Sequence, residues 1–139
     1  MNVVITKRDL EKINFCLNKM ASSSMAQSVL LIDRSGQLIA HYGNRPEIDL
    51  LSLSALTAAN FGATAEIAKI LGEKEFTLLF HKGRSENVYF SAIGEHVIMV
   101  TLFDDNTSLG VIRYQINKIV DELSKIFYSI FERKRVQTK

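Results

Sequence analysis

The sequence predicts an α+β fold, a three-layer α/β/α sandwich whose elements follow the order α-β-β-α-β-β-β-α. Three observations lead to this prediction. Segments at the start and the end of the chain repeat apolar residues with a helical period, and an alanine-rich helical segment lies between them. Several short runs are apolar at almost every position, which is typical of strands covered on both faces. Tight turns join most of these runs, so the strands pair antiparallel and helices cover both sides of one sheet.

The two amphipathic helices have clear limits. The first begins after Thr6, which can cap it with Asp9 as the acidic partner, and it ends in the small residues 21–24. The last begins near residues 107–108 and reaches about Phe131. The apolar faces are Leu10, Ile13, Cys16, Leu17 and Met20 in the first helix, and Ile112, Ile116, Ile119, Val120, Leu123, Ile126, Phe127 and Ile130 in the last.

Five strands lie between the helices. They are predicted over residues 28–33, 37–42, 76–81, 87–93 and 96–103. The turn Asp33–Gly36 joins the first two, and Gly94 with Glu95 forms a tight turn between the last two. The strand order in the sheet does not follow from these patterns.

The middle helix is predicted from Asp49 to about Leu71, after the loop residue Pro46 and before Gly72, which stops it. Its expected contacts with the sheet are Leu53, Leu56, Ile67 and Ile70. The rest of its circumference carries few large side chains. Its small residues are Ala55, Ala58, Ala59, Gly62, Ala63 and Ala65.

The bulk composition narrows the class of protein. The 139 residues are enough for one domain, which is expected over residues 1–132. Residues 133–139 are expected to form a basic, frayed tail, and a weak contact of this tail with an anionic surface is the alternative. A formal net charge of +2 is too small for a dedicated nucleic-acid binder. Cys16 is the only cysteine, so a reducing, cytoplasmic location is expected. No apolar run is long enough for a signal peptide or a membrane span, and we predict no membrane insertion.

No arrangement of residues in the sequence predicts catalysis. There is no phosphate-binding glycine loop, and His41, His81 and His96 lack the spacing of a metal site, so neither cofactor nor metal is expected. Asp104 and Asp105 are the best acid–base pair available. A turn and helix cap is the favoured interpretation of that segment. The function should therefore depend on surfaces rather than on an active site.

Two surfaces are candidates for contact with another chain. Small residues on the middle helix allow a second helix to approach closely, and we favour this over tight packing on the helix's own sheet. The strand at 76–81 is apolar and needs a pairing partner if it lies at an edge. A two-fold dimer would give the middle helix a second helix to pack against and would give the edge strand a pairing partner. Its expected contacts are Ala55, Ala58, Phe76, Leu78 and Phe80.

The element order and several motifs resemble the Roadblock/dynein light chain family, and in particular a bacterial branch of it. The resemblance covers about residues 8–132 and rests on "VLLIDRSGQLIAHYG" (29–43), the stretch 49–76 with "LTAANFGA", "FHKG" (80–83), and "FDDNTSLGVIR" with the helix that follows it (103–131).

The resemblance implies a Roadblock/longin/profilin-like fold with strand order 2-1-5-4-3 and a homodimer formed through the third strand and the middle helix. It further implies binding of a Ras-like small GTPase in its GTP-bound form, with faster hydrolysis obtained by remodelling the GTPase switch loops and without a catalytic arginine. The GTPase-facing positions that it implies are Thr57, Ala59, Asn60, Gly62, Ala63 and Glu66. A dimeric scaffold of the same family, with no effect on GTP turnover, is the alternative.

Overall fold

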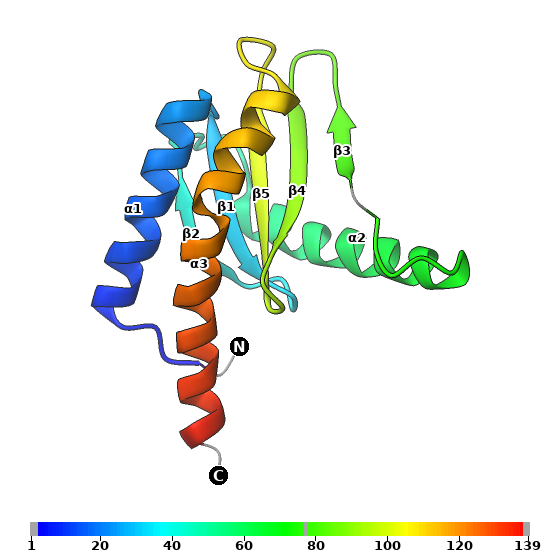
Figure 1. Ribbon diagram of the computed structural model, residues 1–139. Helices are drawn as coiled ribbons and strands as arrows, with labels where there is room; N and C mark the ends of the chain where they lie inside the picture. The colour runs from blue at the N-terminus through cyan, green and yellow to red at the C-terminus, as the bar shows by residue number, and fades with distance from the viewer. Residues whose placement is uncertain (1–2, 77, 138–139) are drawn as a thin grey trace.

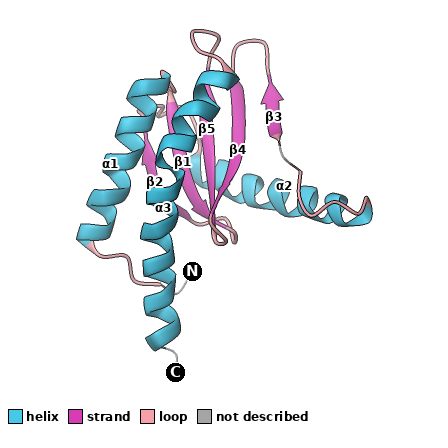
Figure 2. Cartoon of the chain, in the orientation of Figure 1, coloured by secondary structure: helices cyan, strands magenta, loops and turns pink. Residues whose placement is uncertain are grey.

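The computed structural model describes residues 3–76 and 78–137, with side chains described as far as Arg133. The helices are α1 (Lys7–Ser24), α2 (Leu50–Ile70) and α3 (Leu109–Gln137). The strands are β1 (Ser28–Asp33), β2 (Leu38–Tyr42), β3 (Leu79–Lys82), β4 (Asn87–Ile93) and β5 (Val97–Phe103) (Figure 1, Figure 2). The predicted fold class and element order are confirmed. No helix within the described residues is both long and apolar enough to cross a membrane.

The five strands form one antiparallel sheet in the order β2-β1-β5-β4-β3. This is the order that the family resemblance implied. The central strands β1 and β5 pair from Ser28 opposite Leu102 to Asp33 opposite Val97, and all of their residues are buried. β3 lies at one edge of the sheet, where its only strand partner in the described structure is β4.

Helices cover both faces of the sheet (Figure 1), and an apolar core lies on each face. On one face α1 and α3 pack side by side, and the core there includes Ile13, Leu17, Leu31, Met99, Ile112, Ile119 and Phe127. On the other face α2 crosses the strands over a smaller core of Leu30, Ile32, Phe90, Ile98, Val100 and Leu102. Strands that are covered on both sides explain why the sequence of β1 and β5 is apolar at nearly every position.

The capping box predicted for α1 is present. The Asp9 amide donates to the Thr6 hydroxyl at 3.1 Å, and the Thr6 amide donates to the Asp9 carboxylate at 2.9 Å. The prediction that Leu10 belongs to the core was wrong, because its side chain is exposed. Asp9 takes the inward position of the first turn instead, where Arg133 of α3 pairs with it.

The sheet-facing side of α2 differs from the prediction. Leu53 packs against the smaller core, as expected, but Leu56, Ile67 and Ile70 are exposed, so those three contacts were wrong. The side that faces the sheet carries Leu50, Ser54, Thr57, Ala58 and Phe61. Apolar residues occur around the whole helix, and periodicity could not distinguish its two sides. The predicted limits hold, with Asp49 as N-cap and Gly72 at a φ of 80° just after the end.

Two other element limits differ from the prediction. β3 is shorter than the predicted strand at 76–81 and begins at Leu79, while Thr77 within that prediction lies outside the described residues. α3 begins as expected, with Ser108 accepting the Val111 amide at 3.2 Å. Its helical backbone continues to Gln137, beyond the expected end near Phe131, because the residues after Phe131 are mostly strong helix formers. The division into residues 1–132 and a tail stays a prediction.

Candidate interaction surface on helix α2 and strand β3

The outer side of α2 is unusually apolar for a surface helix. The helix crosses the sheet and its C-terminal part extends past β3 (Figure 1). Leu56 is 69% exposed and Ile70 is 84% exposed. The full set of exposed large apolar residues on α2 and the segment leading to β3 is Leu51, Leu56, Ile67, Ile70, Leu71, Phe76 and Leu78. A concentration of this kind, unlike scattered single residues, marks an interaction surface.

Four residues on this outer side form a row along the helix. Leu56, Asn60, Ala63 and Ile67 follow one another at intervals of four, three and four residues, so they lie in one row along the helix. Large apolar residues at the ends of this row flank small or polar ones at its centre. A second helix can fit against such a row, because the central residues leave room for its side chains.

Most of the positions implied for GTPase binding are accessible. Ala59, Gly62, Ala63 and Glu66 are exposed or partly exposed, and Asn60 is half-buried. A Cβ atom added at Gly62 would meet nothing within 4 Å. Glu66 forms an ion pair within its own helix, in which Lys69 donates to the Glu66 carboxylate at 3.1 Å.

Thr57 differs from the other implied GTPase-binding residues. It is only 2% exposed and faces the sheet, and its hydroxyl has no hydrogen-bond partner in the described structure. Its side chain therefore contributes to the contact between α2 and the sheet, and the accessible part of the implied site consists of the other five residues.

Ala55 and Ala58 serve a contact within the chain. A Cβ atom added at Gly36, in the β1–β2 turn, would lie 3.1 Å from the Ala55 Cα and 3.5 Å from the Ala58 Cβ. Gly36 has a φ of 98°, which suits glycine for this turn. On this flank of α2 the small residues thus allow close packing on the chain's own hairpin, the alternative that we disfavoured.

The other three expected dimer contacts lie around β3. Phe76 and Leu78 are exposed. Phe80 is half-buried, and its ring stacks on that of Phe103 with the two ring centroids 6.0 Å apart. The outer edge of β3 can pair with another strand, since a sheet edge presents unpaired backbone donors and acceptors.

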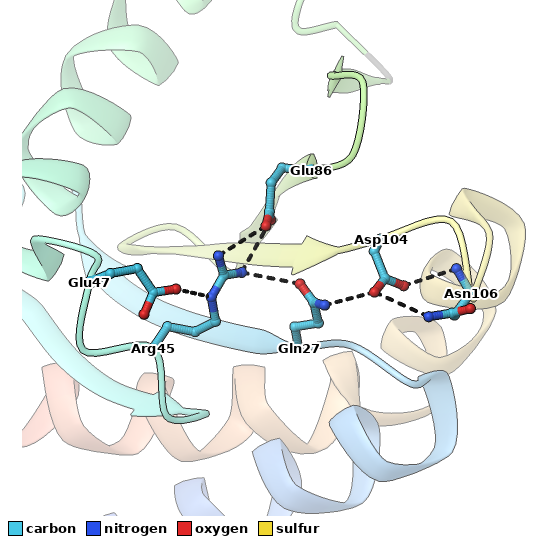
Figure 3. Close-up of polar contacts among 6 residues, drawn as sticks. All are labelled: Gln27, Arg45, Glu47, Glu86, Asp104 and Asn106. Atoms are coloured by element: carbon cyan, nitrogen blue, oxygen red, sulfur yellow. Dashed lines mark hydrogen bonds and ion pairs between the residues drawn. The ribbon is translucent and has the colours of Figure 1, made fainter.

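A polar network fixes the start of α2 relative to the end of β3 (Figure 3). The Arg45 guanidinium donates to Glu47 at 2.7 Å, to Glu86 at 2.9 and 3.1 Å, and to the Gln27 amide oxygen at 3.1 Å. The amide nitrogen of Gln27 donates to Asp104 at 2.8 Å. The hydrogen bonds that Arg45 donates to Glu86, and then the one that it donates to Glu47, raise the pKa of its guanidinium. The network joins the loop before α2, the β3–β4 turn and the β5–α3 turn.

The segment around Asp104 and Asp105 forms the turn before α3 that the favoured interpretation predicted. Asp104 accepts the Asn106 amide at 2.9 Å. Asp105 accepts from the Asn87 side chain at 3.2 Å and from Lys82 at 3.1 Å, and these hydrogen bonds lower the pKa of Asp105. A carboxyl with a lowered pKa is a poor proton donor or acceptor near neutral pH.

The other candidates for chemistry are metal-ligating side chains and the thiol of Cys16. The described residues contain no group of three or more metal-ligating side chains. Cys16 is buried in the α1–α3 layer. Burial, followed by the charge and hydrogen bond of Glu122, raises the pKa of its thiol to about 11. At neutral pH this thiol is protonated, as expected for a structural cysteine.

Comparison with known proteins identifies the family. The Roadblock/LC7 domain model matches residues 12–103. The chain therefore belongs to the Roadblock/LC7 family, whose members are regulators and adaptors rather than catalysts.

Solved structures of MglB are similar to this chain over most of their length. MglB from Myxococcus xanthus shares 40% identity, with 92% of this chain and 96% of that chain covered and a TM-score of 0.84. The gliding protein MglB from Thermus thermophilus shares 30%, with 90% and 95% covered and a TM-score of 0.82. An MglB with a tetrameric arrangement also shares 30%, with 90% and 94% covered and a TM-score of 0.83. Curated protein sequences gave no significant match.

Proposed function

We propose that this chain is a homodimeric regulator of a Ras-like small GTPase of the MglA type, binding the GTP-bound form and accelerating its hydrolysis. The exposed apolar side of α2 next to the unpaired edge of β3, in a chain similar to MglB, carries the proposal. We further propose a cytoplasmic role in bacterial cell polarity or gliding motility, with the protein concentrated at a cell pole.

In the proposed dimer, β3 of each subunit pairs with its two-fold mate, and the two sheets become one. The α2 helices then lie side by side on the same face. Phe76 and Leu78 lie beside β3 and are covered by this arrangement. Pairing of the two β3 strands covers the exposed edge of both subunits, because a two-fold interface uses the same surface of each subunit.

The pair of α2 helices would then form the GTPase platform. Ala59, Asn60, Gly62, Ala63 and Glu66 are its accessible residues. No arginine occurs within α2, so this surface cannot supply the arginine finger that many GTPase activators use. Acceleration would instead come from holding the switch loops of the GTPase in the conformation in which its own residues complete the active site.

GTP turnover by the cognate GTPase, measured with and without this protein, tests the proposal. Size-exclusion chromatography with light scattering, with the GTPase loaded with GDP or a GTP analogue, gives the stoichiometry and the nucleotide preference. We expect a dimer that binds the GTP form and raises the turnover rate. Binding without a change in rate would favour the scaffold alternative, and the absence of a complex with either nucleotide would refute both.

A further inference from the structure

A cavity of about 720 Å³ lies on the side of the sheet opposite α2. It opens between the β4–β5 turn and the C-terminal part of α3, which runs on past that turn (Figure 1). This volume is within the range of small-molecule sites. Within the part of the chain whose side chains are described, its lining residues are Ile93, Gly94, Glu95, His96, Ser124, Lys125, Phe127, Tyr128, Phe131 and Glu132.

The cavity is lined by core residues and by aromatic rings. Ile93 and Phe127 belong to the buried core. The rings of His96 and Phe131 are stacked with centroids 4.2 Å apart. Tyr128 also lines the cavity and is 69% exposed, although it is a large side chain. An aromatic ligand can stack on such rings and cover the apolar surface that they leave in water.

The charged residues that line the cavity indicate the sign of the charge that a ligand would carry. The Glu95 carboxylate lies 4.0 Å from the His96 Nε2 atom, and its side chain is 93% exposed at the turn. Glu132 has an interaction partner of its own. Lys125 forms no ion pair with any side chain in the described part of the chain. We propose that this cavity binds a small aromatic acid, whose ring lies against Tyr128 and Phe131 and whose acidic group pairs with Lys125.

This site is separate from the α2 surface. Its described lining residues come from β4, the β4–β5 turn and α3, and none of them comes from α2 or β3. The cavity therefore shares no described residue with the proposed dimer and GTPase contacts, and the two proposals can fail separately.

The absence of tryptophan from the chain allows a direct test. Tyr128→Trp places a single tryptophan in the wall of the cavity, and Tyr114→Trp places one at an exposed position of the same helix outside it. Each variant is titrated with 4-phenylbutyrate, 4-phenylbutanol and 4-phenylbutylamine, which share a ring and differ in charge. We expect saturable emission changes in Tyr128→Trp only, with the acid binding about three- to fivefold more tightly than the alcohol.

Lys125→Gln should remove the preference for the acid over the alcohol, and Lys118→Gln, a matched change about two turns earlier on α3, should preserve it. Amide chemical shifts of the unsubstituted chain give a second measurement, with changes expected at Ile93–His96 and along the facing part of α3. Tightest binding of the amine or an equal affinity for all three compounds overturns the assignment of an acid. The absence of saturation, or shifts confined to α2, overturns the site.

Discussion

Gly62 is the residue at which the proposed surface is most sensitive to side-chain size. Open space surrounds its Cα, so a side chain is tolerated within the single chain. Replacing glycine in a helix interior also favours the helix by about 1 kcal/mol. The Gly62→Arg variant should therefore fold at least as stably as the parent chain and yet lose the GTPase, because a long charged side chain prevents close approach.

We expect the affinity of Gly62→Arg for the GTP-bound GTPase to fall at least about tenfold, measured by titration of the labelled GTPase. Asn14→Arg, at an exposed position of α1, is the matched control and should bind normally. Unchanged binding by Gly62→Arg would remove this residue from the proposed site.

Asp9 links acid stability to the contact between α1 and α3. Burial alone would raise the pKa of Asp9, but hydrogen bonds from Arg133 and Thr6 outweigh it and hold the pKa below its ordinary value. A carboxyl whose pKa is lowered by folding contributes stability that is complete above its unfolded pKa, about 3.9, and that disappears as the pH falls through the folded value.

Asp9→Asn should therefore cost about 1 kcal/mol of unfolding free energy at pH 7, and the difference from the parent chain should shrink as the pH falls below about 4. Urea unfolding at a series of pH values measures this. Asp121→Asn, an exposed carboxylate of α3, is the control. A difference that stays constant down to acidic pH would show that charge plays no part in the contribution of Asp9.

At the scale of the element, β3 is the strand whose pairing is incomplete. Leu78 precedes it and is 45% exposed, close to the edge that the proposed dimer covers. A lysine near an edge strand opposes edge-to-edge pairing because its charge must stay in water. Leu78→Lys should thus give a folded monomer by sedimentation equilibrium. Phe15→Lys, which replaces an exposed aromatic residue of α1, should leave the dimer intact. A Leu78→Lys dimer of normal affinity would exclude this edge as the interface.

Elements also differ in how far the sequence could predict them. Most of the buried face of α1 follows from its apolar periodicity, and the central strands follow from their continuous apolar runs, whereas the strand order came from the family resemblance. The sheet-facing side of α2 could not be predicted, because Leu56, Ile67 and Ile70 are exposed apolar residues. The network around Arg45 left no signal either, since its partners Gln27 and Glu86 lie 18 and 41 residues away in sequence. Such contacts depend on which loops the completed sheet brings to the same end.

At the scale of the whole molecule, the two faces of the sheet differ in the size of their buried cores. The face under α1 and α3 has a large buried core, and the face under α2 has six buried apolar residues with several half-buried ones around them. The packing of α2 on its own sheet is therefore the weaker of the two layers. If a second copy covers the outer side of α2, part of the stability of this layer comes from association.

This inequality predicts that stability depends on protein concentration. Association that occurs only in the folded state stabilises it by mass action, so the midpoint of thermal unfolding should rise as the concentration is increased from micromolar to hundreds of micromolar. Hydrogen exchange should locate the effect. Amides of α2 and β3 should become better protected with concentration, because local opening there requires dissociation, while amides of α1 and α3 should change little. The Leu78→Lys variant should lose both dependences. Equal protection of both layers at every concentration would show that α2 is held by its own sheet alone.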